Sequence, residues 1–242
     1  MLNVRRVVFV FLLLSAALLP VRADSASEAM EQGNALFALG QYEMAIFQYR
    51  VALPLLSSEQ AAQARYNIGA CYYQLRQMSS AVTEFREAIK IRAGSYPKAS
   101  YALGLALKEL GRLAEARAAF IQAAQHSGER QTEALMELGI LLARDGDYQA
   151  AISRLRQALR QRSRYLPQIH NNLGVILALN GQPTDALEQF DLALKQSGGR
   201  LSEASHNLQL CHRLLDGSAP RLIAELKLSG QANQPADSRS SR

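Results

Sequence analysis

The chain has 242 residues, of which 48% are apolar and 20% charged, proportions that are ordinary for a folded soluble protein. Its net charge of +6 includes Arg5, Arg6 and Arg22, which lie in an N-terminal stretch without acidic residues. Without these three arginines the excess of basic over acidic side chains falls to three, too few to indicate a polyanionic partner. Abundant alanine and leucine and few β-branched residues favour helices.

Residues 1–23 have the pattern of a secretory signal peptide. Two arginines precede the apolar run 7–19, and Val21 and Ala23 stand at the usual cleavage positions before Asp24. The run is shorter than the roughly 20 residues that span a bilayer. We therefore predict an exported protein, either periplasmic or secreted. The alternative is a protein anchored by an uncleaved N-terminal helix.

A fixed spacing organises the middle of the chain. Five glycines, which we call the framing glycines, follow one another at steps of 35 or 36 residues: Gly33, Gly69, Gly104, Gly139 and Gly174. Twelve residues after each glycine comes an alanine, and four residues later a large apolar residue, as in Ala81 and Phe85 of the second repeat. Such a period indicates stacked helical repeats, each of which forms a pair of helices.

The framing glycines are expected to lie where the second helix of a pair crosses the first. A glycine inside a helix costs about 1 kcal/mol relative to alanine, so a close helix contact would explain its presence. A second glycine follows seven residues later in four of the five repeats: Gly40, Gly111, Gly146 and Gly181. We expect it to end the first helix in the left-handed conformation. Arg76 takes its place in the second repeat.

These motifs resemble those of the tetratricopeptide repeat proteins, whose paired helices carry Leu-Gly-x2-Tyr and Ala-x3-Phe. The second repeat carries the two patterns as Ile68-Gly69-x2-Tyr72 and Ala81-x3-Phe85. The tryptophan and the closing proline of the family are missing, and the period is 35 residues instead of the family's roughly 34. The resemblance covers about 26–200. It implies an all-α, right-handed α-solenoid of helix-turn-helix repeats.

The repeat frame also predicts how the chain is divided. The five repeats are placed at about 26–61, 62–96, 97–131, 132–166 and 167–200. A capping helix and a short C-terminal helix are expected within 201–228, because the last repeat of an array would otherwise expose its apolar face. Residues 229–242 have no apolar periodicity and are predicted to be a disordered tail.

The sequence contains no constellation that predicts catalysis or metal binding. No two of the four histidines have the i, i+4 spacing of a helical metal site, and neither cysteine has a second ligand at chelating distance. Cys71 and Cys211 stand four repeats apart, which predicts two separate packing thiols instead of a disulfide. We therefore expect no enzyme, no cofactor and no small-molecule substrate, and the mild charge of an exported chain argues against nucleic acid.

A partner-binding groove is predicted along the inside of the stack, which the first helices line. Its candidate residues surround the framing glycines: Asn34, Phe37, Tyr66, Asn67, Tyr73, Tyr101, Lys108, Met136, Ile140 and Asn172. Exposed aromatic and apolar side chains there would indicate a protein or peptide partner. Asn67 and Asn172 are suited to hydrogen-bond a peptide backbone. The alternative is a narrow groove in which these side chains pack on their neighbours.

A run of arginines forms a second candidate surface. It comprises Arg154, Arg156, Arg160, Arg162 and Arg164, with no acidic residue between Ala150 and Leu166. The run is either a patch for an anionic surface, such as an acidic partner or weakly apposed lipid headgroups, or a solvated outer helix face. The arginines spread around the helix instead of forming one stripe, which favours the solvated face.

The resemblance implies a non-catalytic scaffold or adaptor that binds a peptide or helical segment of a partner protein in the groove. Together with the signal-like N-terminus, it implies a role in the cell envelope. The alternative is a membrane-anchored structural or regulatory subunit of an envelope assembly, such as a secretion, pilus or outer-membrane complex.

Overall fold

The computed structural model describes residues 25–125, 129–216 and 225–229. These residues form helices and turns and include no strand, which confirms the predicted all-α fold. The described residues divide into two compact units, one up to residue 110 and one from residue 111 to residue 229. The predicted signal segment 1–23, and the tail beyond residue 229, lie outside the described residues. None of the described helices combines the length and the apolarity needed to cross a membrane.

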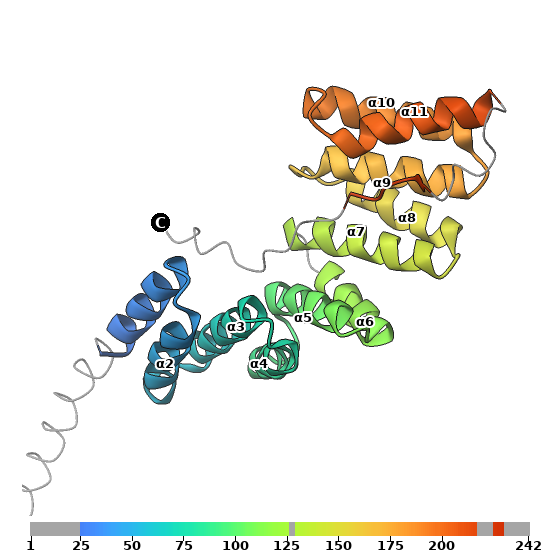
Figure 1. The fold of residues 1–242 in the computed structure, drawn as a ribbon. Helices are drawn as coiled ribbons and strands as arrows, with labels where there is room; N and C mark the ends of the chain where they lie inside the picture. The colour runs from blue at the N-terminus through green and yellow to red at the C-terminus, as the bar shows by residue number, and fades with distance from the viewer. Residues whose placement is uncertain (1–24, 126–128, 217–224, 230–242) are drawn as a thin grey trace, which may run out of the picture. The chain divides into compact units, whose positions relative to one another are not determined.

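The first unit consists of successive helices that each pack on the next (Figure 1). They are a helix at 25–38, α2 (Tyr42–Ala52), the 3-10 helix η1 (Leu53–Leu55), α3 (Ser58–Gln74), α4 (Met78–Ile91) and α5 (Pro97–Glu109). A capping box begins α3, because the Ser57 hydroxyl accepts from the Gln60 N–H and the Gln60 side chain accepts from the Ser57 N–H. Pro97 lies in the first turn of α5, where a missing N–H costs nothing.

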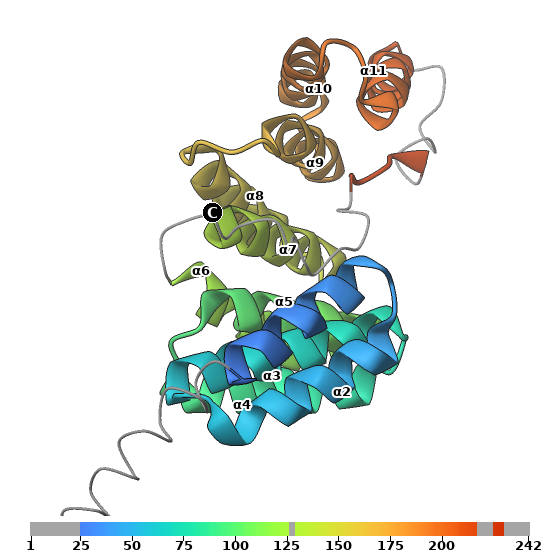
Figure 2. The ribbon, with the colours of Figure 1, turned by 90° about the vertical axis from the view of Figure 1, so that its left-hand side faces the viewer.

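The second unit also consists of successive helices that pack on one another. Its helices are α6 (Leu113–Ala124), α7 (Glu129–Arg144), α8 (Tyr148–Leu159), α9 (Leu166–Leu179), α10 (Pro183–Ser197) and α11 (Ser202–Leu215). The solitary helix α11 packs on both α10 and α9, as Figure 2 shows. It therefore serves as the predicted capping helix, which covers the apolar side of the last pair.

Four of the framing glycines lie directly against the large apolar residue of the paired helix. A Cβ atom on Gly69 would lie 2.7 Å from the ring of Phe85, and one on Gly174 would lie 2.6 Å from the ring of Phe190. The same relation joins Gly33 to Tyr49 and Gly139 to Leu155. Real Cβ contacts essentially never fall below 3.0 Å, so these positions require glycine unless the neighbour shifts. The predicted close approach is thus present, with the large side chain filling the space.

The turns inside the helix pairs adopt the expected left-handed conformation. The backbone angle φ is +75° at Gly40, +84° at Gly146 and +78° at Gly181. Arg76, which replaces glycine in the second repeat, takes the same conformation with φ of 59°. A non-glycine residue pays roughly 1–2 kcal/mol for it. The exposed Arg76 side chain forms an ion pair of 2.9 Å between its Nη2 and Glu109 Oε2.

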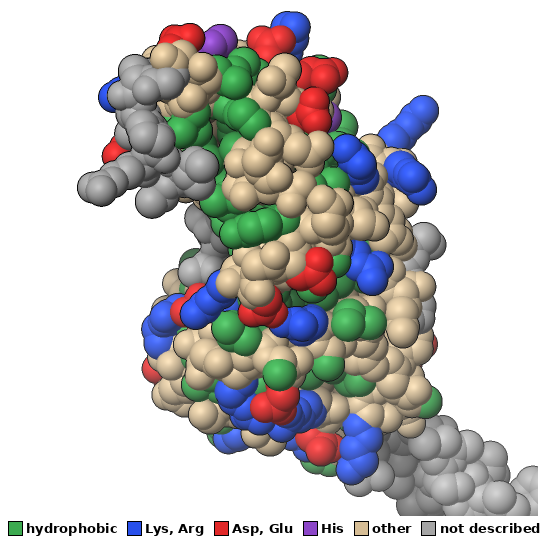
Figure 3. Space-filling view, turned by 90° about the vertical axis from the view of Figure 1, so that its right-hand side faces the viewer, with side chains coloured by type: hydrophobic (Ala, Val, Ile, Leu, Met, Phe, Trp, Pro, Cys, Tyr) green, Lys and Arg blue, Asp and Glu red, His purple; other side chains and the backbone are tan. Residues whose placement is uncertain are grey.

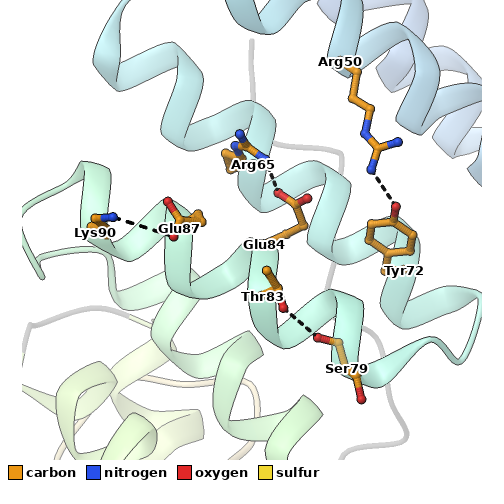
Figure 4. Close-up of polar contacts among 8 residues, drawn as sticks. All are labelled: Arg50, Arg65, Tyr72, Ser79, Thr83, Glu84, Glu87 and Lys90. Atoms are coloured by element: carbon orange, nitrogen blue, oxygen red, sulfur yellow. Dashed lines mark hydrogen bonds and ion pairs between the residues drawn. The ribbon is translucent and has the colours of Figure 1, made fainter.

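Polar contacts tie neighbouring helices of the first unit together (Figure 4). Arg50 Nη2 on α2 donates to the Tyr72 hydroxyl on α3 at 2.8 Å. Arg65 Nη1 on α3 pairs with Glu84 Oε2 on α4, also at 2.8 Å. Glu84 is buried, and a buried carboxylate needs such a partner because its hydration is lost. These pairs connect α2 with α3 and α3 with α4.

Candidate functional site

The predicted groove residues differ widely in exposure. Five are buried, namely Tyr66, Tyr73, Tyr101, Met136 and Asn172. Four are half-buried, namely Phe37, Asn67, Lys108 and Ile140, and Asn34 is exposed. The expectation of an exposed aromatic and apolar lining is therefore wrong for Tyr66, Tyr73, Tyr101 and Met136. For these four the alternative applies, in which the side chains pack on their neighbours.

Tyr66 illustrates the physical reason for this correction. Its ring lies 5.7 Å from the ring of Phe85 on the paired helix and 5.9 Å from that of Tyr96, just before α5. The Lys98 ammonium lies 4.7 Å from the centre of the same ring. The next repeat thus closes over this position, and a large side chain that faces it is removed from water. Met136 belongs likewise to the apolar core of the second unit.

The amide side chains of the first unit bond to other side chains. Asn67 Nδ2 donates to Asn34 Oδ1 at 3.2 Å, and the Tyr49 hydroxyl donates to the same oxygen at 2.8 Å. Gln63 Nε2 donates to Asn67 Oδ1 at 2.8 Å, and Gln63 Oε1 accepts from the Tyr96 hydroxyl. This chain of bonds runs between neighbouring helices and satisfies these amides within the unit.

In the second unit, by contrast, an asparagine on α9 bonds to a distant piece of backbone. The Asn172 amide donates from Nδ2 to the Ser229 carbonyl at 2.8 Å, and its Oδ1 accepts from the Ser229 N–H at 2.6 Å. Asn172 is buried and lies two residues before the framing glycine Gly174. A carboxamide presents one donor and one acceptor side by side, so it matches both backbone groups of a single residue.

The capping helix α11 repeats this arrangement. Asn207 Nδ2 donates to the Lys227 carbonyl at 2.8 Å, and Asn207 Oδ1 accepts from the Lys227 N–H at 2.8 Å. Asn207 stands 35 residues after Asn172, at the same position of the repeat frame. Asn172 on α9 and Asn207 on α11 therefore make equivalent hydrogen bonds to the backbone of two residues in one segment.

A third asparagine, Asn171, lies between these two pairs of hydrogen bonds and bonds to residues of both. Asn171 Nδ2 lies 3.0 Å from the Ser229 hydroxyl and 3.0 Å from the Lys227 carbonyl, and its Oδ1 accepts from Asn207 Nδ2 at 2.8 Å. All three asparagines are buried, and so is Ser229. The network fixes the orientation of every amide, because exchanging oxygen and nitrogen would place donor against donor. We call Asn171, Asn172 and Asn207 the asparagine site.

The bonded segment 226–229 lies across α9 and close to α11 (Figures 1 and 2). In an extended chain, the N–H and C=O of one residue point to the same side, and this side recurs two residues later. The bonds to Lys227 and Ser229 follow this period. Leu226 packs on the apolar core, whereas the side chains of Lys227 and Leu228 are exposed. The site therefore bonds to the backbone of Lys227 and Ser229, and the side chains that are enclosed are those of Leu226 and Ser229.

This segment corrects two sequence predictions. The short helix expected to end at residue 228 is wrong in its described part, because residues 226–229 are not helical. The start of the predicted disordered tail is also wrong, because Ser229 is placed and buried. The physical reason is that the asparagine amides satisfy the backbone groups that a helix would otherwise pair. The predictions for 217–224 and 230–242 fall outside the described residues.

Sequence reasoning found one member of the asparagine site and missed the others. Asn172 was a candidate because it adjoins a framing glycine. Asn207 lies in the stretch predicted to form the cap and is not among the candidate residues, although its 35-residue spacing from Asn172 is visible in the sequence. Lys227 and Ser229 carry no sequence signal, since they belong to no repeat and their backbone makes the contacts.

The five arginines of the predicted patch are all exposed. Arg154 donates to Gln157 at 3.4 Å, and Arg164 donates to the Tyr165 hydroxyl at 2.8 Å. The set extends from α8 into the turn that follows it, so it does not form one helix face. On the face of the molecule that Figure 3 draws, basic and acidic side chains are interspersed. The anionic-surface role of the arginines stays a prediction.

Both cysteines are buried, free thiols. Burial raises the pKa of the Cys71 thiol to about 12, so it stays protonated at neutral pH. The Cys211 thiol donates to the Pro183 carbonyl at 3.2 Å, and burial also raises its pKa. Both are therefore inert packing groups. Within the described ranges, no three His, Cys, Asp or Glu side chains are grouped so that they could hold a metal ion.

The helical-repeat architecture was compared with protein families and with solved structures. A tetratricopeptide repeat family model matches residues 24–99, 101–163 and 136–200. No curated protein sequence gives a significant match. Among solved structures, YrrB, described as a tetratricopeptide repeat protein with an unusual peptide-binding site, is 27% identical with a TM-score of 0.59, covering 79% of this chain and 95% of its own.

Two further structures share the fold at lower identity. MamA from Desulfovibrio magneticus RS-1 is 18% identical with a TM-score of 0.62, covering 74% of this chain and 98% of its own. The Rap conjugation gene regulator of the plasmid pLS20, in complex with the Phr* peptide, is 20% identical with a TM-score of 0.52, covering 81% of this chain and 60% of its own. The family model covers most of the chain, and the paired helices, framing glycines and left-handed turns agree with it, so the protein belongs to the tetratricopeptide repeat family.

Proposed function

We propose that this protein is a non-catalytic adaptor that binds an extended segment of a partner protein at the asparagine site. One observation carries the proposal: Asn172 and Asn207 each form two hydrogen bonds to the backbone of one residue in a non-helical segment. Backbone recognition at two alternate residues is how an extended peptide is bound whatever its exact sequence. The peptide-binding site in the description of YrrB and the Phr* peptide in the complex of the Rap regulator support a peptide as the ligand.

The proposal is tested by removing the amides without changing the size of the side chains. The variant Asn172→Leu/Asn207→Leu should lose binding to peptides that the wild-type chain captures from an array of extended sequences. Each doubly bonded amide contributes about 1.4 kcal/mol, which corresponds to roughly a 100-fold loss for the pair. Affinities would be measured by fluorescence anisotropy on the captured peptides.

The matched control is Asn34→Leu/Asn67→Leu in the first unit. These amides bond to other side chains, so peptide affinity should stay within about threefold of the wild type. If the control variant loses the captured peptides and the Asn172/Asn207 variant keeps them, the asparagine site is not where partners bind.

We also propose that the adaptor works in the cell envelope. The arginine pair, the apolar run and the small residues of 1–23 support export. N-terminal sequencing of the native protein is expected to begin at Asp24. A native chain that begins at Met1 and stays in the cytoplasmic fraction would contradict this part of the proposal.

A further inference from the structure

We propose that residues 226–229 are a self-ligand which holds the asparagine site closed, and that the displacing partner segment carries the same pattern. This pattern is an apolar residue followed, three positions later, by serine. The inference rests on the proposed function, because it concerns the ligand of the same site. It goes further in naming the side chains that the partner must present and the segment that it must displace.

The contacts of the segment meet the requirements of a bound ligand. Four hydrogen bonds of 2.6–2.8 Å join its backbone to Asn172 and Asn207. No regular secondary structure of its own holds residues 226–229 in place. Because the backbone of the segment bonds to asparagine side chains, another chain with equivalent backbone groups can take its place. The asparagines would make the same bonds to either chain.

Two side chains of the segment define the preferred sequence. Leu226 packs against the apolar core of the second unit, so this position selects an apolar side chain. The Ser229 side chain is only 2% exposed, and its hydroxyl lies 3.0 Å from Asn171 Nδ2. This burial favours a small side chain, and an apolar one would leave the buried Asn171 donor with fewer partners. Lys227 and Leu228 point to solvent and set no requirement.

Residues 226–229 compete with a partner segment for the asparagine site, and their covalent link to α11 favours them. Residues 216–226 connect the end of α11 to Lys227, the first residue whose backbone bonds to the asparagine site. Because the segment belongs to the same chain as the site, its binding is intramolecular, with an effective concentration on the order of millimolar. A free partner segment of equal intrinsic affinity therefore binds the closed protein weakly. Partners that offer a better apolar anchor, or several linked segments, open the site.

The test releases the segment in the full-length chain and leaves the asparagines untouched. In Lys227→Pro/Ser229→Pro, the two N–H groups that Asn207 and Asn172 accept are removed, because proline has none. The probe is a fluorescein-labelled peptide with the sequence of residues 224–231. We expect this variant to bind the peptide at least tenfold more tightly than the wild type. Leu228→Pro is the matched control, since no asparagine accepts from Leu228, and should bind like the wild type.

Peptide variants test the sequence pattern on the released protein. Replacing the leucine at position 226 by aspartate, or the serine at position 229 by valine, should weaken binding about tenfold. Replacing the leucine at position 228 by alanine should change it less than twofold. Equal affinity of all four peptides would overturn the proposed pattern.

Three outcomes separate this inference from the proposed function. If the released variant binds the labelled peptide no better than the wild type, the self-ligand inference fails. If it nevertheless binds other peptides through Asn172 and Asn207, the proposed function stands. If sedimentation shows a wild-type dimer that the double proline variant converts to a monomer, the occupant is the tail of a second copy, and the intramolecular closure is wrong.

Discussion

Tyr66→Ala is expected to lower the free energy of unfolding by about 3–5 kcal/mol, the usual cost of deleting a fully buried aromatic ring. The side chain is 2% exposed and lies between the rings of Phe85 and Tyr96. Truncation at this position opens a cavity where two repeats meet, which the packed helices cannot fully close. Urea denaturation followed by circular dichroism measures the loss, with the m-value checked for a change in cooperativity.

The matched control is Phe47→Ala on α2, where the same kind of ring is 64% exposed. Its effect should stay within about 0.5 kcal/mol, because little packing is lost. A second comparison, Tyr66→Phe, keeps the ring and should lose no more than about 1.5 kcal/mol. If Tyr66→Ala were as stable as Phe47→Ala, Tyr66 would be a surface residue, as the groove prediction required.

Gly174→Ala is expected to destabilise the second unit, although alanine is the better helix former. The new Cβ atom would lie 2.6 Å from Cε1 of Phe190, a ring that is itself completely buried. Overpacking of this kind costs about 1–3 kcal/mol, and the gain in helix propensity offsets up to about 1 kcal/mol of it. Differential scanning calorimetry should show a lower Tm.

Two comparisons assign this loss to the contact with the ring. Gly139→Ala meets the branched tip of Leu155 at 2.9 Å, which can turn aside more easily than a ring, so its cost should be smaller. The double variant Gly174→Ala/Phe190→Leu should be more stable than the two separate costs predict, by about 1 kcal/mol. Strictly additive effects would show that the glycine is required for another reason.

The asparagine site shows where sequence reasoning stopped. Asn172 was identified because repeat periodicity places it beside a framing glycine, and periodicity is a local property that a sequence displays. Its partner residue Ser229 lies 57 positions away in a stretch without periodicity. That contact depends on where the chain returns after α11, which no spacing rule predicts. The segment also bonds through its backbone, which is the same in every residue other than proline.

The aromatic residues predicted to line the groove show a second limit of prediction from sequence. The 35-residue period correctly assigned Tyr66 and Tyr101 to the first helices of their repeats. It did not determine whether the facing helix stands far enough away to leave a groove, because that distance depends on packing with the next repeat. An aromatic residue that lines a partner site and one that fills a core have the same helical spacing.

The sequence by itself determined the helix pairs, their glycine contacts, their left-handed turns and the need for a capping helix, because each follows from short-range spacing and backbone conformation. Even Arg76, which departs from the glycine pattern, adopts the conformation that its position demands. Only the tertiary structure decided which side chains remain accessible and what occupies Asn172 and Asn207. Those outcomes arise from contacts between segments far apart in the chain, whose free energies depend on the whole packed arrangement.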